Sequence, residues 1–284
     1  MKDENIQEAI FNSSWNTRQQ DVVDEQMTSF YPAIIIADHN NPKSMIGARQ
    51  VIDSIISTDS ELTPSILPAT VPATLDYWLR NSRMGFGMDR SWWRYPPAGE
   101  VRRDLKSGLT LTGYQAKDQL KVFSAAISHY RAWEQLSLFD GGFVFEHDAV
   151  ITKKISTNGM ELATRGIVGL NDPRGSTRKS MLYHQRTVLE DGPFGSVKTK
   201  HDYGGYAYRI GSVPWVDDDK TVPQGLAGNS AYFISGKSCR KMLGLVEEHG
   251  VWPNDALMCR QLIKCNQVFP YMTKLQRIES TTTG

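Results

Sequence analysis

Two kinds of apolar pattern follow one another along this chain. Short, mostly apolar runs of strand length occur at 32–37, 142–146, 230–235 and 268–272. Other segments place apolar residues every three or four positions, as helices do, at 44–56, 115–138, 238–248 and 254–263. Because buried strands read as continuous apolar runs and packed helices carry an apolar stripe, the pattern predicts an α/β fold that opens with a strand and a helix.

Stretches without either pattern set the expected boundaries. Residues 1–30 are polar and unpatterned, which is typical of a leader or a loosely packed N-terminal segment. Residues 31–275 are expected to form a single domain, and 276–284 a flexible tail. Within the domain, residues from about 80 to 108 mix Gly, Pro, Arg and aromatic residues without periodicity, so we expect a long basic and aromatic loop insertion there.

The composition supports a protein that folds around its own core. With 284 residues, 40% of them hydrophobic and 22% charged, the chain can bury a large core without disulfides. Cys239, Cys259 and Cys265 lack the spacing of a zinc site or a redox pair, so we expect buried thiols in a reducing compartment. No apolar stretch has the length of a signal peptide or a membrane span. These features predict a cytoplasmic protein without a transmembrane segment.

Positive charge is concentrated in two segments. The net charge is only +1, yet residues 80–106 hold seven basic and three acidic residues, and residues 174–201 hold six basic and two acidic residues. Each segment therefore carries +4, and the rest of the chain carries −7. Such an asymmetry indicates an anionic partner.

The apolar run at 142–146 ends in two carboxylates one residue apart, Glu146 and Asp148. Open α/β sheets bind ligands beyond the carboxyl ends of their strands, and paired carboxylates suit a divalent cation. Strand alternation is expected to turn His147 the opposite way. The same spacing of acids occurs at 217–219, but no apolar strand precedes that run, so we interpret it as a solvated turn. Two acids that only cap a loop are the structural alternative for Glu146 and Asp148.

Several segments, in order along 32–275, resemble the family 25 glycosyltransferases, whose members include lipooligosaccharide galactosyltransferases. The helix at 123–133 resembles the family's CALSHI.LW helix, and residues 145–149 stand where the family has LEDDA. Further segments resemble GTHAYIIS at 228–235, the PVD after the next helix at 252–255, and, loosely, the first strand and arginine at 34–37 and Arg49. Two departures are the middle acid, which is His147, and the usual histidine of GTHAY, which is Ser230.

The resemblance implies a GT-A fold, with a Rossmann-like mixed sheet flanked by helices, that moves a sugar from a UDP-sugar to an acceptor. It implies a Mn²⁺ or Mg²⁺ site at Glu146 and Asp148, where the cation would neutralise the diphosphate as the nucleotide leaves. The donor-binding candidates are Ile36, Asp38, Arg49, Ser128, His129 and Glu146. Ser128 and His129 could equally be buried helix residues, and Asp38 could serve hydrogen bonds within its own turn.

The resemblance also implies inversion at the anomeric carbon, which requires a base that removes the hydroxyl proton of the acceptor. The candidate base is Asp255, which follows a Pro-Asn turn at the start of a predicted helix. An acid in that place could instead be only the N-cap of the helix.

The two basic segments suggest the acceptor. Arg90, Trp92, Trp93 and Arg94 interleave cations with aromatic rings, which can meet phosphates and stack on bases or sugars, unless the tryptophans pack inward. The second basic segment adds Arg174, Arg178 and Lys179, and together these residues favour a polyanionic acceptor.

Lipopolysaccharide core and DNA are both polyanions of this kind. We favour DNA, because a soluble chain that is basic around its site resembles what a family 25 fold would become in a bacteriophage enzyme that glycosylates hydroxymethylated pyrimidines such as hydroxymethylcytosine. Such an enzyme could turn the target nucleotide out of the stack, a step that aromatic wedges assist. A non-catalytic module that binds carbohydrate or nucleic acid through a GT-A-like sheet is the alternative outside enzymes.

Overall fold

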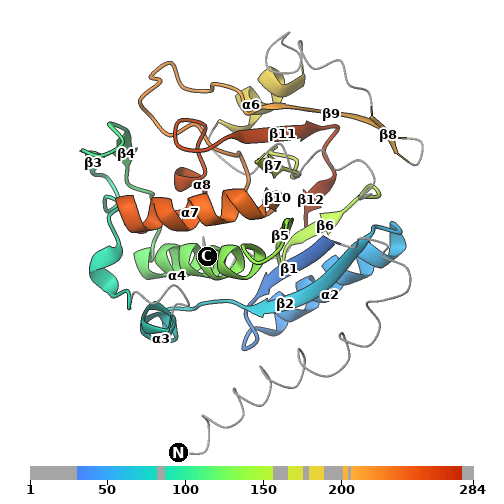
Figure 1. The fold of residues 1–284 in the computed structure, drawn as a ribbon, viewed down its shortest axis with the longest axis horizontal. Helices are drawn as coiled ribbons and strands as arrows, with labels where there is room; N and C mark the ends of the chain where they lie inside the picture. The colour runs from blue at the N-terminus through green and yellow to red at the C-terminus, as the bar shows by residue number, and fades with distance from the viewer. Residues whose placement is uncertain are drawn as a thin grey trace, which may run out of the picture. The chain divides into compact units, whose positions relative to one another are not determined.

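The computed structural model describes residues 31–81, 87–155, 166–174, 179–188, 201–203 and 206–276. Their core is an eight-stranded sheet with the order β2-β1-β5-β10-β7-β11-β9-β8 (Figure 1). Its strands are β1 (Tyr31–Ala37), β2 (Leu62–Pro68), β5 (Gly141–Glu146), β7 (Ile167–Gly169), β8 (His201–Tyr203), β9 (Tyr206–Ser212), β10 (Ala231–Ser235) and β11 (Cys265–Phe269). Outside this sheet, β3 (Val101–Arg103) pairs with β4 (Thr110–Thr112), and β6 (Ala149–Ile151) pairs with β12 (Thr273–Leu275).

The strand directions bring several strand ends to one edge of the sheet. β1 runs parallel to β2 and β5, whereas β10 runs antiparallel to β5 and β7. β11 is parallel to β7, so the carboxyl ends of β1, β2, β5, β7 and β11 share one edge, and β10 begins there. In open α/β sheets this edge is where ligands bind.

Helices cover both faces of this sheet. They are α2 (Pro42–Ser57), α3 (Leu75–Arg80), α4 (Gln119–Leu136), α6 (Ser180–Val188), α7 (Gly236–His249) and α8 (Asn254–Leu257), with a 3-10 turn η1 (Arg90–Trp92). α2 packs on the face that holds Ile35 and Phe143, and α4 and α7 lie side by side on the face that holds Ile34 and Val144 (Figure 1). The predicted α/β fold with a mixed sheet flanked by helices is confirmed.

Side-chain caps fix where two of these helices begin. The Asn41 side chain accepts hydrogen bonds from the backbone N–H groups of Lys43 and Ser44, and Pro42 occupies the first turn of α2. The Asp118 side chain accepts from the backbone N–H of Leu120 at the start of α4. Both helix starts therefore have some of their free N–H groups satisfied by their own sequence.

The apolar pattern misses α3, α6 and eight strands: β2, β3, β4, β6, β7, β8, β9 and β12. β2 lies at the edge of the sheet and contains Pro64 and Pro68, residues that lack the N–H needed for pairing on both sides. It therefore shows no continuous apolar run, although β1 pairs with it along its whole length. The apolar pattern therefore fails to predict β2 because this strand lies at the edge of the sheet, and not because its pairing is weak.

Two elements have boundaries in the structure that differ from the predicted ones. β11 begins before the predicted run at 268–272, because Asn266 and Gln267 are buried polar residues whose amides donate to the carbonyls of Ile167 and Gly169. The helix predicted at 254–263 ends as α8 at Leu257, because the chain beyond it forms a β-bridge between Cys259 and Gly225.

Several broader expectations can be compared with the described residues. The three cysteines are free and buried, as predicted. The insertion from about 80 to 108 contains η1 and β3, and β3 pairs with β4. Within the described ranges, every helix is too short or too polar to cross a membrane. The predicted leader at 1–30 and most of the tail at 276–284 lie outside the described residues.

Candidate functional site

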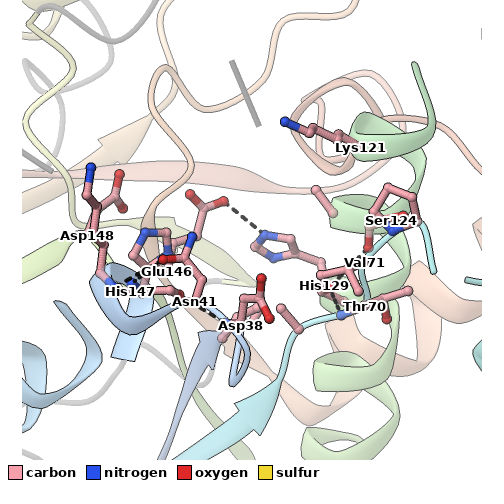
Figure 2. Close-up of a pocket in the computed structure, with 17 residues that line it drawn as sticks. Asp38, Asn41, Thr70, Val71, Lys121, Ser124, His129, Glu146, His147 and Asp148 are labelled. Atoms are coloured by element: carbon pink, nitrogen blue, oxygen red, sulfur yellow. Dashed lines mark hydrogen bonds and ion pairs between the residues drawn. The ribbon is translucent and has the colours of Figure 1, made fainter. Parts of the chain in front are cut away.

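A cavity of about 400 Å³ opens at the carboxyl edge of the sheet. It lies between the ends of β1 and β5, the start of α2, the segment that follows β2, and α4 (Figure 2). Its lining residues fall within 36–44, 69–72, 121–129 and 146–148. The cavity is therefore built from five elements that are separated in sequence and meet because of the strand order.

Glu146 and Asp148 both line this cavity, from the last residue of β5 and from the turn that follows it. The Oδ1 atom of Asp148 is buried and has no hydrogen-bond partner within the described part of the chain. Burial, and then the neighbouring Glu146 charge, raise the pKa of Asp148 to about 7. Its own burial and the negative charge of Glu146 therefore disfavour the ionised form of Asp148, and a bound cation would stabilise that form.

His147 also lines the cavity, rather than the opposite face of the sheet as strand alternation predicted. The reason is that β5 ends at Glu146, and residues 147 and 148 form a turn in which alternation no longer applies. Burial lowers the pKa of His147.

The donor set fits a Mg²⁺ or Mn²⁺ ion that is shared with a ligand. Among the described residues, no three His, Cys, Asp or Glu side chains converge as a complete metal site. Mg²⁺ does not require one, because it commonly takes one or two carboxylates and completes its coordination with phosphate oxygens and water. The partnerless Oδ1 of Asp148 is an oxygen ligand of this kind. Glu146 and Asp148 are therefore the residues that would hold such an ion.

The predicted helix pair Ser128 and His129 lies in the wall of the cavity, and each has protein partners. His129 contacts Glu146 through Nε2, at 3.2 Å from Oε1, and Tyr232 through Nδ1, at 2.9 Å from the hydroxyl oxygen. The Ser128 hydroxyl donates to the Ser124 carbonyl and accepts from the backbone N–H of Thr70. Ser128 therefore ties the segment after β2 to α4.

The remaining predicted donor residues lie on β1, on its loop and on α2. Ile36 and Asp38 line the cavity. The Asp38 carboxylate accepts the backbone N–H of Asn40, so it also serves its own turn, as the structural alternative had it. Arg49 is exposed on α2 and is not among the lining residues. Ile36 and Asp38 therefore line the same cavity as Glu146 and Asp148, and Arg49 does not.

Asp255 lies in the first turn of α8 and outside the lining of this cavity. The Tyr114 hydroxyl donates to its Oδ1 at 2.5 Å. Burial raises the pKa of Asp255, the Tyr114 bond opposes that change, and the Glu146 charge adds to it. The N-cap of this four-residue helix is Pro253, so Asp255 is not the cap.

The first basic segment divides into paired and unpaired side chains. Arg90 makes two hydrogen bonds to Asp76, at 2.7 and 2.9 Å. The Trp93 ring packs on Phe123 of α4 with 4.9 Å between ring centroids, in keeping with the inward alternative. Arg94 is exposed and, with the half-buried Trp92, lines a second cavity of about 500 Å³ that Arg102, Arg103 and Lys106 also line.

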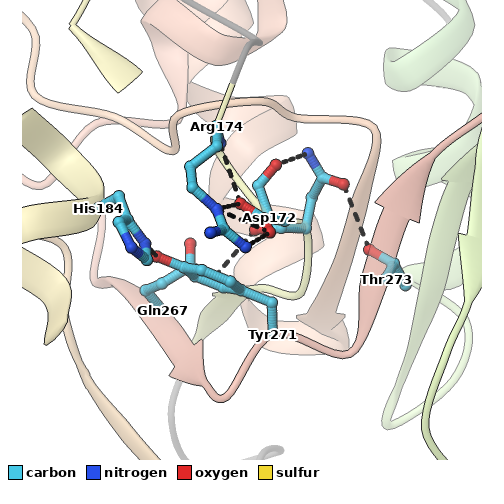
Figure 3. A network of polar contacts seen from close by, with 7 residues as sticks. Asp172, Arg174, His184, Gln267, Tyr271 and Thr273 are labelled. Carbon is cyan, nitrogen blue, oxygen red and sulfur yellow. Dashed lines mark hydrogen bonds and ion pairs between the residues drawn. The ribbon is translucent and has the colours of Figure 1, made fainter. Parts of the chain in front are cut away.

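In the second basic segment, the cations that the structure describes have partners within the chain. Figure 3 shows Arg174 bound to Asp172, with the closest pair of atoms at 2.5 Å. His184 contacts the hydroxyl of Tyr271 in the same network, at 3.0 Å. Lys179 forms an ion pair with Asp217, which belongs to the acidic run interpreted as a solvated turn. Arg178 lies outside the described residues.

Two residues of α4 line the cavity but are not predicted from the sequence. Lys121 and Ser124 lie one turn apart and line the cavity, and the Ser124 hydroxyl is buried without a hydrogen-bond partner among the described residues. Together with Ser128 they form a row of polar residues along α4, at spacings of three and four residues. That row is the signal available in the sequence.

Comparison with known proteins gives only distant likenesses. No protein-family model matches this sequence, and no curated protein matches it. The chain is similar to an active-site mutant of LgtC (10% identity, TM-score 0.36, covering 83% of this chain and 72% of that one). It is also similar to the apo bifunctional glycosyltransferase WbbM (11%, 0.36, 86% and 39%) and to the galactosyltransferase LgtC with donor and acceptor sugar analogs (14%, 0.35, 83% and 72%). At TM-scores this low, the functional argument rests on the site itself.

Proposed function

We propose that this chain is a cation-dependent glycosyltransferase of GT-A type, which moves a sugar from a UDP-sugar to a hydroxyl group. The observation that carries the proposal is the pair Glu146 and Asp148 in a cavity at the carboxyl edge of the sheet, with a buried Asp148 oxygen that has no partner among the described residues. Buried polar atoms are nearly always hydrogen-bonded, so one that is not needs an explanation, and beside a second carboxylate in a cavity a bound cation supplies one.

The proposed chemistry divides between the acids and Asp255. Glu146 and Asp148 would hold Mn²⁺ or Mg²⁺, which neutralises the charge of the departing diphosphate. Asp255 accepts the proton of the attacking hydroxyl. Its pKa is raised by burial, which makes it a stronger base, and the hydrogen bond from Tyr114 orients it. A single displacement with this base inverts the anomeric carbon.

The acceptor that we propose is DNA carrying hydroxymethylated pyrimidines, with lipopolysaccharide as the second choice. Support comes from Arg94 and Arg103, which make no ion pair within the described residues and line the same cavity of about 500 Å³. Cations without internal partners are free to meet phosphates. Arg90, Arg174 and Lys179 support the acceptor less, because each already has a carboxylate partner.

Transfer of labelled sugar tests this function. UDP-sugars are offered with Mn²⁺ and one of three acceptors: duplex containing hydroxymethylcytosine, unmodified duplex, or lipooligosaccharide. Labelled product on the hydroxymethylated duplex alone is the expected result. Product on lipooligosaccharide alone, or equally on unmodified duplex, contradicts the DNA acceptor. A protein that shifts duplex in gels and ignores UDP with Mn²⁺ is a binding module instead.

A further inference from the structure

A buried hydrogen-bond chain runs from the core of the domain to Glu146. The Trp133 indole N–H donates to the Tyr232 hydroxyl at 2.8 Å, that hydroxyl contacts His129 Nδ1 at 2.9 Å, and His129 Nε2 contacts Glu146 Oε1 at 3.2 Å. Trp133, Tyr232 and His129 are each at most 1% exposed. Only the last member, Glu146, reaches the cavity with an exposed part of its side chain.

The chain has one direction in which every proton finds an acceptor. An indole nitrogen can only donate, so the Tyr232 oxygen accepts from Trp133. The single Tyr232 proton then goes to His129 Nδ1, which must be the unprotonated nitrogen of a neutral ring. His129 Nε2 therefore carries the ring proton and donates a hydrogen bond to Glu146. If Nδ1 were protonated instead, the buried Tyr232 proton would have no partner in this chain, which is costly in a dry interior.

The geometry also restrains the His129 ring. His129 and Trp133 lie four residues apart on α4, so both point from the same side of the helix. The Tyr232 ring stacks on the His129 ring, with 5.8 Å between centroids and 23° between planes. Hydrogen bonds at both nitrogens and a stacked ring together leave the imidazole one orientation.

The four residues of this hydrogen-bond chain come from three separate segments, and each segment is one of those that resemble the family 25 glycosyltransferases. His129 and Trp133 belong to the helix at 123–133, Glu146 to 145–149, and Tyr232 to the strand at 228–235. In the structure these segments are α4, the end of β5 and β10, and the hydrogen-bond chain is where they meet.

We propose that Trp133 and Tyr232 are positioning residues, which hold His129 as the Nε2–H tautomer and thereby orient Glu146. One Glu146 oxygen is engaged by His129, and the other remains for a cation. This inference rests on the proposed function, since it assigns a role toward the cation of the same site. Groups that hydrogen-bond a metal ligand typically change metal affinity by about 10–100-fold when they are removed.

The test uses Tyr232→Phe in the full chain, with Tyr183→Phe as the matched control. Tyr183 is also a fully buried tyrosine with one side-chain partner, Gln267 at 3.2 Å, and it lies outside the chain to Glu146. Mn²⁺ affinity is measured in the presence of UDP, from the electron paramagnetic resonance signal of free Mn²⁺. We expect Tyr232→Phe, which acts on Glu146 only through His129, to weaken Mn²⁺ binding by up to about 10-fold, and Tyr183→Phe to leave it unchanged.

A second readout does not depend on the cation. Nitrogen-15 NMR of histidine-labelled protein reports which ring nitrogen of His129 is protonated, and we expect Nε2–H in the unsubstituted chain and a changed tautomer mixture in Tyr232→Phe. If Tyr232→Phe fails to fold, Trp133→Phe provides the same comparison, because it removes the first donor and leaves the Tyr232 hydroxyl in place.

The outcomes separate the two claims. Equal Mn²⁺ affinity in folded Tyr232→Phe and the unsubstituted protein, or an Nδ1–H tautomer in the latter, overturns the positioning role and leaves the glycosyltransferase proposal standing. If the unsubstituted protein binds no Mn²⁺ in the presence of UDP, the proposed function fails, and the positioning role fails with it.

Discussion

The cavity at the carboxyl edge of the sheet and the two basic segments both concentrate charged side chains, yet the described residues differ in whether those charges have partners within the chain. In the cavity, Asp148 keeps a buried oxygen without a partner among the described residues. In the basic segments, three of the cations that suggested an acceptor site are bound to carboxylates of the same chain: Arg90, Arg174 and Lys179. A buried group without a partner is therefore a stronger indication of a ligand than a concentration of charge along the sequence.

The energetic reason is the environment of each group. An exposed ion pair such as Arg90 with Asp76 contributes little to stability, because solvent screens it, and both charges are satisfied without any ligand. A buried polar atom without a partner carries a desolvation cost of about 1–3 kcal/mol. Such a cost in the cavity is consistent with a group that completes its contacts only when cation and nucleotide are bound.

The largest expected effect concerns the proposed base. Asp255→Asn keeps the size of the side chain and removes its ability to accept a proton. We expect kcat for sugar transfer to fall by about 10²–10⁴-fold, while UDP still binds with Mn²⁺. Rapid-quench transfer of labelled sugar measures this, and an undiminished kcat would remove Asp255 from the mechanism.

The next largest effect concerns Lys121, the lysine of α4 that lines the cavity. Lys121 lines the cavity that holds Glu146 and Asp148, whereas Lys117 is an exposed lysine just before the same helix. A hydrogen bond from a charged group contributes about 1.5–3 kcal/mol, so Lys121→Ala should weaken UDP binding by about 10-fold or more, and Lys117→Ala should not. Calorimetric titration gives both dissociation constants. Equal values would place Lys121 outside the nucleotide site.

A smaller effect should distinguish the arginines that lack an ion pair in the described part of the chain from those that have one. Arg94→Ala with Arg103→Ala should reduce the slope of log affinity for duplex DNA against log salt by about 2, since each removed phosphate contact changes it by about 1. Arg90→Ala with Arg174→Ala should change it by less, because those cations already have partners. Identical slopes for the two double variants would erase the distinction between the groups.

The smallest effect is on stability. In metal-free buffer at pH 8, Asp148→Asn should raise the melting temperature by about 2 °C, because it removes a buried like charge beside Glu146. The folded state holds the Asp148 proton up to a pKa of about 7, so the unsubstituted protein loses stability as pH rises toward that value. The gain from Asp148→Asn should therefore shrink between pH 8 and pH 5. Calorimetric melting at both pH values tests this, and a lower melting temperature at pH 8 would contradict it.

Much of the central fold can be predicted from the sequence, for a physical reason. β1, β5 and β10 are covered on both faces, so they read as continuous apolar runs, and the helices that cover them carry clear apolar stripes. The edge strand β2 and the polar start of β11 escape, because Pro64 and the buried amides of Asn266 and Gln267 obscure the pattern.

The site is predictable to a similar extent. The acids Glu146 and Asp148 can be found because they follow an apolar strand. The pairing of Arg90 with Asp76 and of Lys179 with Asp217 could not be found, because ion pairs form between side chains that only the fold brings together. The role of Tyr232 could not be found either, since its partner His129 lies on another element.

The proposed function requires Glu146 and Asp148 to hold a cation that binds the donor nucleotide. The most direct measurement is the melting temperature with UDP, with and without Mn²⁺, for the unsubstituted protein and for Asp148→Asn. A ligand at 100 times its dissociation constant stabilises a protein by about 2.7 kcal/mol, so we predict a clear Mn²⁺-dependent rise with UDP that Asp148→Asn loses. An equal rise in both proteins, or none in the unsubstituted protein, would contradict the claim.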